Sequence, residues 1–284
     1  MALATDTSSV KDSWGAAVSG SLGTLRGRRW LIWYFVQREL SKTYRGSLLG
    51  FAWAFLTPLL MIFLYTLVFS QILGLRFREV EGDSAVNFGI YLYCGLLPFL
   101  TFSQSLTKST NSIKSNSALI SKTAFPPEIL PLATSLTAIV DKLFGLGVLI
   151  LVVAVLGYGV EWTLFLLPVI LVSQLIFTLG LGYLFSVLGA YLPDVKETLE
   201  SVVRAMFFVT PIIWPASRVE GTNLQFVVDY NPLAFLVEAY RGAILDGVAP
   251  DTSSLLIFTL FSVALLICGF ALFVRTKRRF VDLI

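Results

Sequence analysis

The sequence predicts an all-α membrane protein that crosses a lipid bilayer several times. Hydrophobic residues make up 56% of the 284 residues, and charged residues make up only 14%. A soluble domain has about 25% charged residues, so this chain has too few for a fully water-exposed surface. The other two observations are a set of long segments without any charge, and a concentration of Lys and Arg at a few positions between them.

Four charge-free segments are long enough to cross a bilayer. A helix needs about 20 apolar residues to span roughly 30 Å of hydrocarbon. A fifth segment, 143–160, has 18 residues and reaches this length if the helix starts near Thr137 and buries Asp141 and Lys142 in the inner leaflet. The four longer segments are 46–75, 84–107, 162–193 and 252–274.

A sixth span follows from parity. Segment 205–217 has only 13 uncharged residues, and it reaches span length if it starts near Leu199 and Arg204 extends toward the surface. The strings "RGRRW" near the N-terminus and "RTKRRF" near the C-terminus are strongly basic, and basic flanks stay in the cytoplasm. Two cytoplasmic termini require an even number of crossings. The predicted spans are 48–75, 86–108, 137–159, 162–192, 199–217 and 252–274.

The charge distribution supports this orientation. All but four of the 21 Lys and Arg residues lie on the predicted cytoplasmic side, and the exceptions are Arg76, Arg78, Arg218 and Arg241. Residues 1–25 are polar and rich in small residues, with no apolar segment of a signal peptide. Residues 1–29 are therefore expected to form a loose cytoplasmic tail.

A helix lying in the headgroup plane is predicted for residues 30–45. Aromatic and apolar residues fall on one face of this segment, while Arg38, Lys42 and Arg45 fall on another. The alternative is a simple basic anchor with an aromatic belt. The aromatic and apolar face consists of Trp30, Trp33, Tyr34, Leu40 and Tyr44.

Two predicted cytoplasmic loops have features of a contact surface. Loop 111–132 changes from polar and basic residues to Pro126, Pro127 and Glu128. Prolines end one helix and are tolerated in the first turn of the next, so a rigid elbow suited to transmitting force is expected; a simple turn is the alternative. In the second loop, Asp194 is a candidate N-cap, with Glu197 three residues later as its capping-box partner.

The predicted outer segment 218–250 is too apolar for an open loop. Its strings "LQFVV" and "PLAFLVEAYRGAIL" cannot span, and Asn231 and Pro232 break the chain between them. A re-entrant or surface-lying pair of helices is expected, with Glu238 and Arg241 paired at spacing i,i+3. Such a pair would be an outer gate formed by Asn231, Pro232, Glu238 and Arg241, or a structural lid.

The sequence predicts no catalytic and no metal site in this chain. It has no histidine, no G-x-x-x-x-G-K-[ST] phosphate loop, and no loop with paired carboxylates or an activated nucleophile. Cys94 and Cys268 lie in apolar runs and are interpreted as core residues. Any nucleotide chemistry must therefore belong to another polypeptide, and no cofactor is expected here.

Three strings resemble the transmembrane subunits of polysaccharide-export ABC transporters of the ABC-2 class. They are "RELSKTYRGSLLGFAWAFLTPLLMIFLYTLVF", "NSALISKTAFPPEILPL" and "NPLAFLVEAYRGAIL". The resemblance extends over about residues 30–275, which makes 30–284 one transmembrane domain. It implies six spans and a channel with aromatic lining in a bacterial plasma (inner) membrane.

The resemblance also implies partners and roles. Two copies of the chain would pair with two copies of a separate ATPase that binds ATP and Mg. Arg38, Lys42, Tyr44 and Arg45 would frame the entrance for an undecaprenyl-pyrophosphate-linked glycan. A second set of residues would couple the chain to the ATPase: Asn116, Lys122, Pro126, Pro127 and Glu128, with Asp194 and Glu197 of the second loop.

Other functions remain as alternatives. An ion-coupled transporter would carry acids at mid-depth and inverted repeats, whereas only Asp141 and Lys142 are candidates and the halves show no symmetry. A membrane transferase would need acidic loop residues that are missing. Within the class, exporters of teichoic acid, capsule, drugs or small lipids remain open. No nucleic-acid partner is expected.

The six-span topology predicts that both ends of segment 218–250 face outward. In a chain with Cys94→Ala and Cys268→Ala, single cysteines replacing Arg218 or Asp251 should react with a membrane-impermeant maleimide added to intact cells. An Arg278→Cys control should react only after permeabilisation. Labelling of positions 218 and 251 from opposite sides would contradict the six-span topology.

Overall fold

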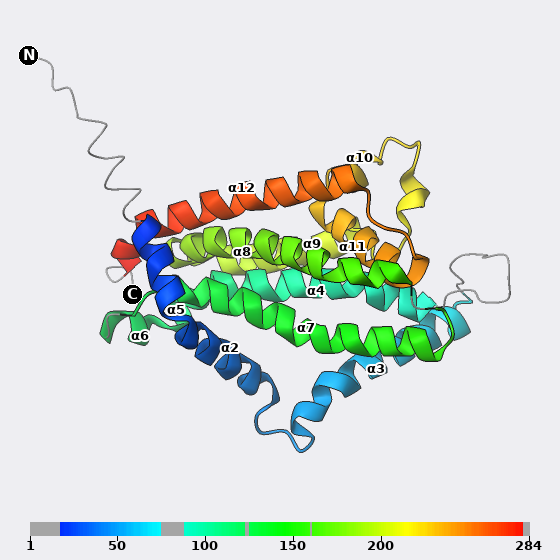
Figure 1. Cartoon of the computed structure of the whole chain (residues 1–284), viewed down its shortest axis with the longest axis horizontal. Coiled ribbons are helices and arrows are strands. Elements are labelled where there is room, and N and C mark those ends of the chain that lie inside the picture. Colours follow the sequence, from blue (N-terminus) through cyan, green and yellow to red (C-terminus); the bar gives the residue numbers. More distant parts are fainter. Residues whose placement is uncertain (1–17, 75–87, 123–124, 160, 281–284) are drawn as a thin grey trace, which may run out of the picture.

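The computed structural model describes residues 18–74, 88–122, 125–159 and 161–280. This part of the chain is helical and contains no strand. The longest helices lie side by side in one bundle, as Figure 1 shows. Residue 18 and Phe280, the described ends of the chain, lie at the same end of the bundle as α5 and α6, and we call this the basic end.

Four described helical segments are long and apolar enough to cross a membrane. The chain is therefore a multi-pass membrane protein, as the charge-free segments predicted. Three of these segments are composite. A 3-10 helix and a π-helix flank α3 (Trp53–Tyr65), and the 3-10 helix η3 (Trp162–Leu166) precedes α8 (Leu167–Tyr191). A further 3-10 helix, η6 (Lys277–Arg279), follows α12 (Thr252–Thr276). The four segments are Gly50–Ile72, Ile129–Val155, Trp162–Tyr191 and Thr252–Arg279.

Helix α4 (Phe88–Thr110) has 23 residues, which is also long enough for a span, but it is less apolar. It lies in the centre of the bundle, in contact with α3, α7 (Ile129–Val155), α8 and α11 (Pro232–Arg241). Its buried serine and threonine hydroxyl groups are hydrogen-bonded inside the protein. For example, the Ser105 Oγ donates to the Ser135 Oγ at 2.9 Å. A central helix does not face lipid, so it tolerates polar residues that a lipid-facing helix does not.

The first predicted boundary that needs correction is the start of the third span. Helix α7 begins at Ile129, eight residues before the predicted Thr137. Pro131 lies in its first turn, where a missing N–H costs no intrahelical bond. Asp141 and Lys142 consequently lie near the middle of α7 and not at its start.

The second correction concerns predicted span 199–217. Helix α9 (Val195–Val209) starts earlier and ends eight residues sooner. Thr210 is extended, with φ −78° and ψ 138°, because the following Pro211 disfavours a helical conformation at this position. With 15 residues α9 is about 22 Å long, so a sixth crossing would need the non-helical residues after it, and the six-span count stays a prediction.

The third correction concerns the N-terminal tail. Residues 18–27 form a helix and not a loose segment, while residues 1–17 lie outside the described part. Ser21 is buried, and the Lys277 Nζ donates to its hydroxyl at 2.8 Å. Ser21 therefore ties this helix to the residue that follows α12 (Thr252–Thr276).

Glycine residues allow α8 and α12 to approach closely. A Cβ at Gly180 would lie 2.7 Å from the backbone N of Leu266, and one at Gly269 would lie 2.3 Å from the Gly180 carbonyl oxygen. In membranes, small residues let helices pack backbone to backbone, where van der Waals contact stabilises association. α12 begins at Thr252 because the Asp251 side chain caps it by accepting from the Ser254 N–H at 2.8 Å.

This contact predicts a strong effect of one methyl group. Gly180→Ala should lower the unfolding free energy by about 1–3 kcal/mol, because α12 backbone atoms must move. Gly147→Ala on α7 is the matched control, since a Cβ there meets no atom within 4 Å. Alanine has a higher helix propensity than glycine, so this variant should be as stable as the wild type or more stable. Thermal unfolding in detergent measures both, and equal melting temperatures would contradict the close contact.

Candidate functional site

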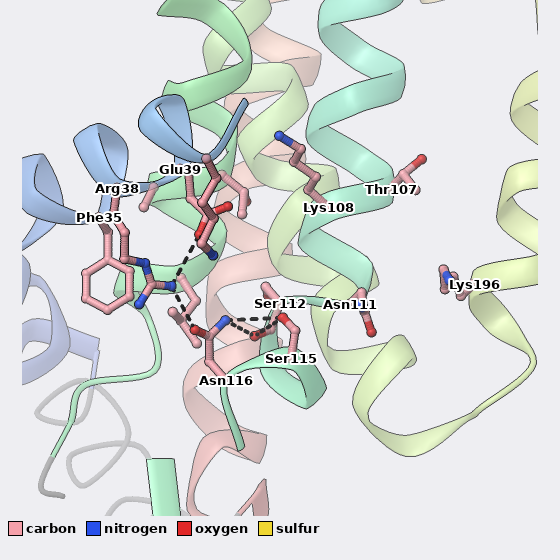
Figure 2. A pocket seen from close by; sticks show the side chains of 14 residues that line it. Phe35, Arg38, Glu39, Thr107, Lys108, Asn111, Ser112, Ser115, Asn116 and Lys196 are labelled. Carbon is pink, nitrogen blue, oxygen red and sulfur yellow. Dashed lines mark hydrogen bonds and ion pairs between the residues drawn. The ribbon is translucent and has the colours of Figure 1, made fainter. Parts of the chain in front are cut away.

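A basic cavity of about 310 Å³ lies at the basic end of the bundle. α2 (Arg29–Tyr44) forms one wall, and α4, α5 (Ser112–Ser115), α7 and α9 form the others. Figure 2 shows Lys108 on α4 and Lys196 on α9 at its rim, opposite Arg38. The lining residues that carry polar or charged side chains are Arg38, Glu39, Lys42, Thr107, Lys108, Asn111, Ser112, Ser115, Asn116, Thr134 and Lys196.

Helix α2 confirms the predicted helix at 30–45 within one residue at each end. It runs obliquely to the bundle (Figure 1). Trp30, Trp33 and Tyr34 are exposed, while Phe35 and Val36 are buried against the bundle. Exposed aromatic residues on an oblique helix suit the polar–apolar boundary of a membrane, although its position in the headgroup plane stays a prediction.

Arg38 links α2 to Asn116, which directly follows α5. Its Nη2 donates to the Asn116 Oδ1 at 3.1 Å and to the Glu39 Oε1 at 3.2 Å (Figure 2). Asn116 is held in turn, because its Nδ2 donates to the Ser112 carbonyl at 2.9 Å. The guanidinium also lies 4.4 Å from the Phe35 ring centroid. The sequence placed Arg38 and Asn116 in separate groups, and the structure brings them into contact.

The cavity carries a net positive charge. Four cations, Arg38, Lys42, Lys108 and Lys196, face one acid, Glu39. Partial burial raises the pKa of Glu39, but the hydrogen bonds and charges of Lys42 and Arg38 outweigh it and hold this pKa below its ordinary value. Glu39 is therefore ionised at neutral pH and orders the two cations of α2. Such a site suits a phosphate-bearing ligand.

Tyr44 and Arg45 do not line this cavity, in contrast to Arg38 and Lys42. The Tyr44 hydroxyl donates to the Asp141 Oδ1 at 2.6 Å, and the Lys142 Nζ donates to the Asp141 Oδ2 at 2.8 Å. Burial, and then the hydrogen bond to Asp141, raise the pKa of Tyr44. Tyr44 thus fixes the end of α2 to the middle of α7, while Arg45 is exposed just beyond α2.

Two basic residues of the cavity were missed by sequence reasoning. Lys108 ends one charge-free segment and Lys196 follows another. Basic residues just outside adjacent spans on the same side of the membrane are a signal that could have indicated them. What the sequence did not indicate is that α4 and α9 contact each other.

The elbow at Pro126, Pro127 and Glu128 has a different environment from the predicted one. Glu128 is buried, and its Oε1 accepts from the Lys277 Nζ at 2.9 Å. The Tyr183 hydroxyl donates to the Glu128 carbonyl oxygen at 3.0 Å. In this conformation the carboxylate faces the C-terminal basic segment, and a role of Glu128 in ATPase coupling stays a prediction. The basic string at the C-terminus supplies the counterion of Glu128. The sequence did not predict this pair, because the two residues are 149 positions apart.

The remaining predicted coupling residues do not line the cavity. Lys122 ends α6 (Ser117–Lys122), and its side chain lies outside the described part of the chain. Asp194 directly precedes α9 as predicted, but its side chain makes no capping hydrogen bond and its backbone is helical. The predicted capping box is therefore wrong. Asp194 and Glu197 are exposed, and a role in ATPase coupling stays a prediction.

At the opposite end of the bundle, Asn231 and Pro232 begin a helix as predicted. α10 (Phe226–Asp229) precedes them, and α11 starts at Pro232. The Asn231 Oδ1 accepts from the Leu233 N–H at 3.0 Å, and its Nδ2 donates to the Thr210 Oγ1 at 3.1 Å. Asn231 therefore caps α11 and fixes it to the segment after α9.

Arg241 is a clamp at this end. Its guanidinium is 1% exposed and donates to the carbonyl oxygens of Pro211 and Ile212, each at 2.7 Å. It lies 3.6 Å from the Tyr91 ring centroid, and the predicted contact with Glu238 is confirmed at 3.0 Å. One cation thus holds α11, the start of α4 and the non-helical segment after α9. A gating role stays a prediction.

The helical bundle, with four segments that can cross a membrane and a basic cavity at one end, defines a multi-pass membrane protein. The sequence matches the family model "ABC-2 type transporter" over residues 31–245, and the chain belongs to this family.

Curated relatives cover most of the chain. An O-antigen export system permease protein RfbA from Myxococcus xanthus is 28% identical over 89% of this chain and 95% of its own. An RfbA from Klebsiella pneumoniae is 29% identical with the same coverage. The polysialic acid transport protein KpsM from Escherichia coli is 28% identical over 84% of this chain and 90% of its own.

The Arg241 clamp predicts an order of stability among variants. Arg241→Lys keeps the charge but loses the planar fork that reaches two carbonyl groups, so it should cost about 2–4 kcal/mol. Glu238→Gln should cost less, because Glu238 is 45% exposed. Thermal unfolding in detergent measures both. An equal loss in the two variants would show that the Glu238 pair, and not the carbonyl contacts, holds this end.

Proposed function

We propose that the chain is the channel-forming permease of an ABC exporter that moves a lipid-linked polysaccharide across the plasma membrane. The observation that carries the proposal is the coverage of the relatives: the similarity runs through 90–95% of their chains. RfbA and KpsM are named for different glycans. The similarity to both therefore supports polysaccharide as the class of cargo and selects no particular glycan.

The basic cavity suits the head of such a cargo. In the proposal, Arg38 and Lys42 on α2 bind the pyrophosphate of an undecaprenyl-pyrophosphate-linked glycan, and Lys108 and Lys196 complete the site. Arginine binds phosphate oxygens bidentately, and lysine adds a point charge. The exposed aromatic residues of α2 suit a boundary position, where the pyrophosphate of a membrane-anchored lipid lies.

Energy would come from a separate subunit. A second copy of the chain and two copies of an ABC ATPase, which bind ATP and Mg, complete the proposed complex. The Arg38–Asn116 hydrogen bond supports a path for force: a partner that moves α5 and α6 would also pull on α2 and the cavity. The two described chain ends meet at the basic end, which supports two cytoplasmic termini.

The proposal predicts that this chain alone hydrolyses no ATP. ATP hydrolysis should appear when the chain is reconstituted with the ATPase that co-purifies with the tagged chain from native membranes. Replacing the lysine in the phosphate loop of that ATPase should abolish the hydrolysis. Phosphate release in proteoliposomes measures both cases. Sustained ATP hydrolysis by the contaminant-free chain would contradict the proposal.

Removing cavity charge should weaken binding of the cargo head. In nanodiscs, Arg38→Gln and Lys108→Gln should each lower the affinity for undecaprenyl pyrophosphate about fivefold, because each cation near an anionic group contributes about 1 kcal/mol. Arg204→Gln, exposed on α9 outside the cavity lining, is the matched control. If the double variant with Arg38→Gln and Lys108→Gln inserts well and binds undecaprenyl pyrophosphate with wild-type affinity, the cavity does not bind the cargo head.

A further inference from the structure

A second, apolar groove lies at the basic end, on a different face from the basic cavity. It has a volume of about 490 Å³, within the range of about 300–1,000 Å³ for small-ligand sites. The helix of residues 18–27 forms one wall through Leu22 and Leu25, and α8 and α12 form the other through Tyr183, Ile267 and Phe270. Its lining is almost entirely apolar, so it does not suit a polar solute.

The groove opens on a surface that faces lipid. Leu22 and Ile267, on its two walls, are 52% and 62% exposed. The same helix α12 exposes Leu256, Leu260 and Phe261 further along the bundle. Because α12 is long and apolar enough to cross a membrane, this exposed apolar face suits contact with hydrocarbon. The groove is therefore reached from the bilayer.

Three arginines lie outside the lining of the groove, on the two elements that flank its basic end. The 3-10 helix η6 (Lys277–Arg279) ends α12, and Arg26 lies on the helix of residues 18–27. The Lys277–Ser21 hydrogen bond of 2.8 Å brings these two elements together. Arg26, Arg278 and Arg279 are exposed, and the sequence has no acid within residues 18–38 or 252–280.

We propose that this groove binds one acyl chain of an anionic phospholipid, whose phosphate is held by Arg26, Arg278 and Arg279. The apolar lining takes the chain, and the three guanidinium groups take the negative headgroup. A zwitterionic lipid would fill the groove equally well but would gain less from the arginines. The site is thus selective for the charge of the headgroup.

The bound lipid also stabilises the elbow. The Tyr183 ring lines the groove, and its hydroxyl donates to the carbonyl oxygen of Glu128. Lys277 contacts both Ser21 of the groove helix and the Glu128 carboxylate. An acyl chain that fixes the helix of residues 18–27 therefore also restrains Glu128, and the melting temperature of the protein should rise when the lipid binds.

The test uses delipidated full-length protein in detergent. It is incubated with phosphatidylglycerol or with phosphatidylcholine carrying the same acyl chains. Native mass spectrometry counts the retained lipids, and thermal unfolding reports the stability. The wild type should retain one phosphatidylglycerol per chain in preference to phosphatidylcholine and should melt higher with it. Arg278→Gln and Arg279→Gln should each lower the preference about fivefold.

Filling the groove tests the acyl-chain part separately. Leu22→Trp should abolish retention of phosphatidylglycerol, while Leu260→Trp, on the lipid-facing surface of α12 outside the groove, should leave it unchanged. Equal retention of the two lipids by the wild type would overturn the proposal. It would also be overturned if inorganic phosphate raised the melting temperature as much as phosphatidylglycerol, because the arginines would then act without the groove.

Discussion

The hydrocarbon of a bilayer offers no hydrogen-bond partner, and this constraint determines how the bundle is arranged. Polar side chains must find partners inside the protein. Gln174 of α8 shows the result: it is fully buried, its Nε2 donates to the Pro98 carbonyl at 2.9 Å, and its Oε1 accepts from the Tyr240 hydroxyl at 2.6 Å. One amide thus joins α4, α8 and α11 at a depth where water is scarce.

Charged residues follow the same constraint at both ends of the bundle. At one end the Arg241 guanidinium satisfies two carbonyl groups that Pro211 leaves without helical partners. At the other end Lys277 donates to one oxygen, Oε1, of the buried Glu128 carboxylate. Neither contact resembles an exposed ion pair, which contributes little to stability. Removing one partner would leave a buried charge without compensation, which is strongly destabilising.

The basic end combines three elements that are distant in the sequence. The helix of residues 18–27, the elbow at Pro126–Glu128 and the end of α12 meet at Lys277, while α2 is tied to α5 and α6 through Arg38 and Asn116. Glu128 is therefore a structural residue of the elbow in this conformation.

The sequence by itself determined the membrane class, the family resemblance, the helix at 30–45 and the break at Asn231 and Pro232. These depend on charge-free length, helical periodicity and proline, which act within about 20 residues. Only the tertiary structure decided that Glu128 faces Lys277, that Arg38 meets Asn116, and that Lys108 and Lys196 share a cavity. Such contacts depend on which helices are neighbours. Helix adjacency is set by close packing at residues such as Gly180 and Gly269, and the positions of these glycines in the sequence do not specify which helix they will pack against.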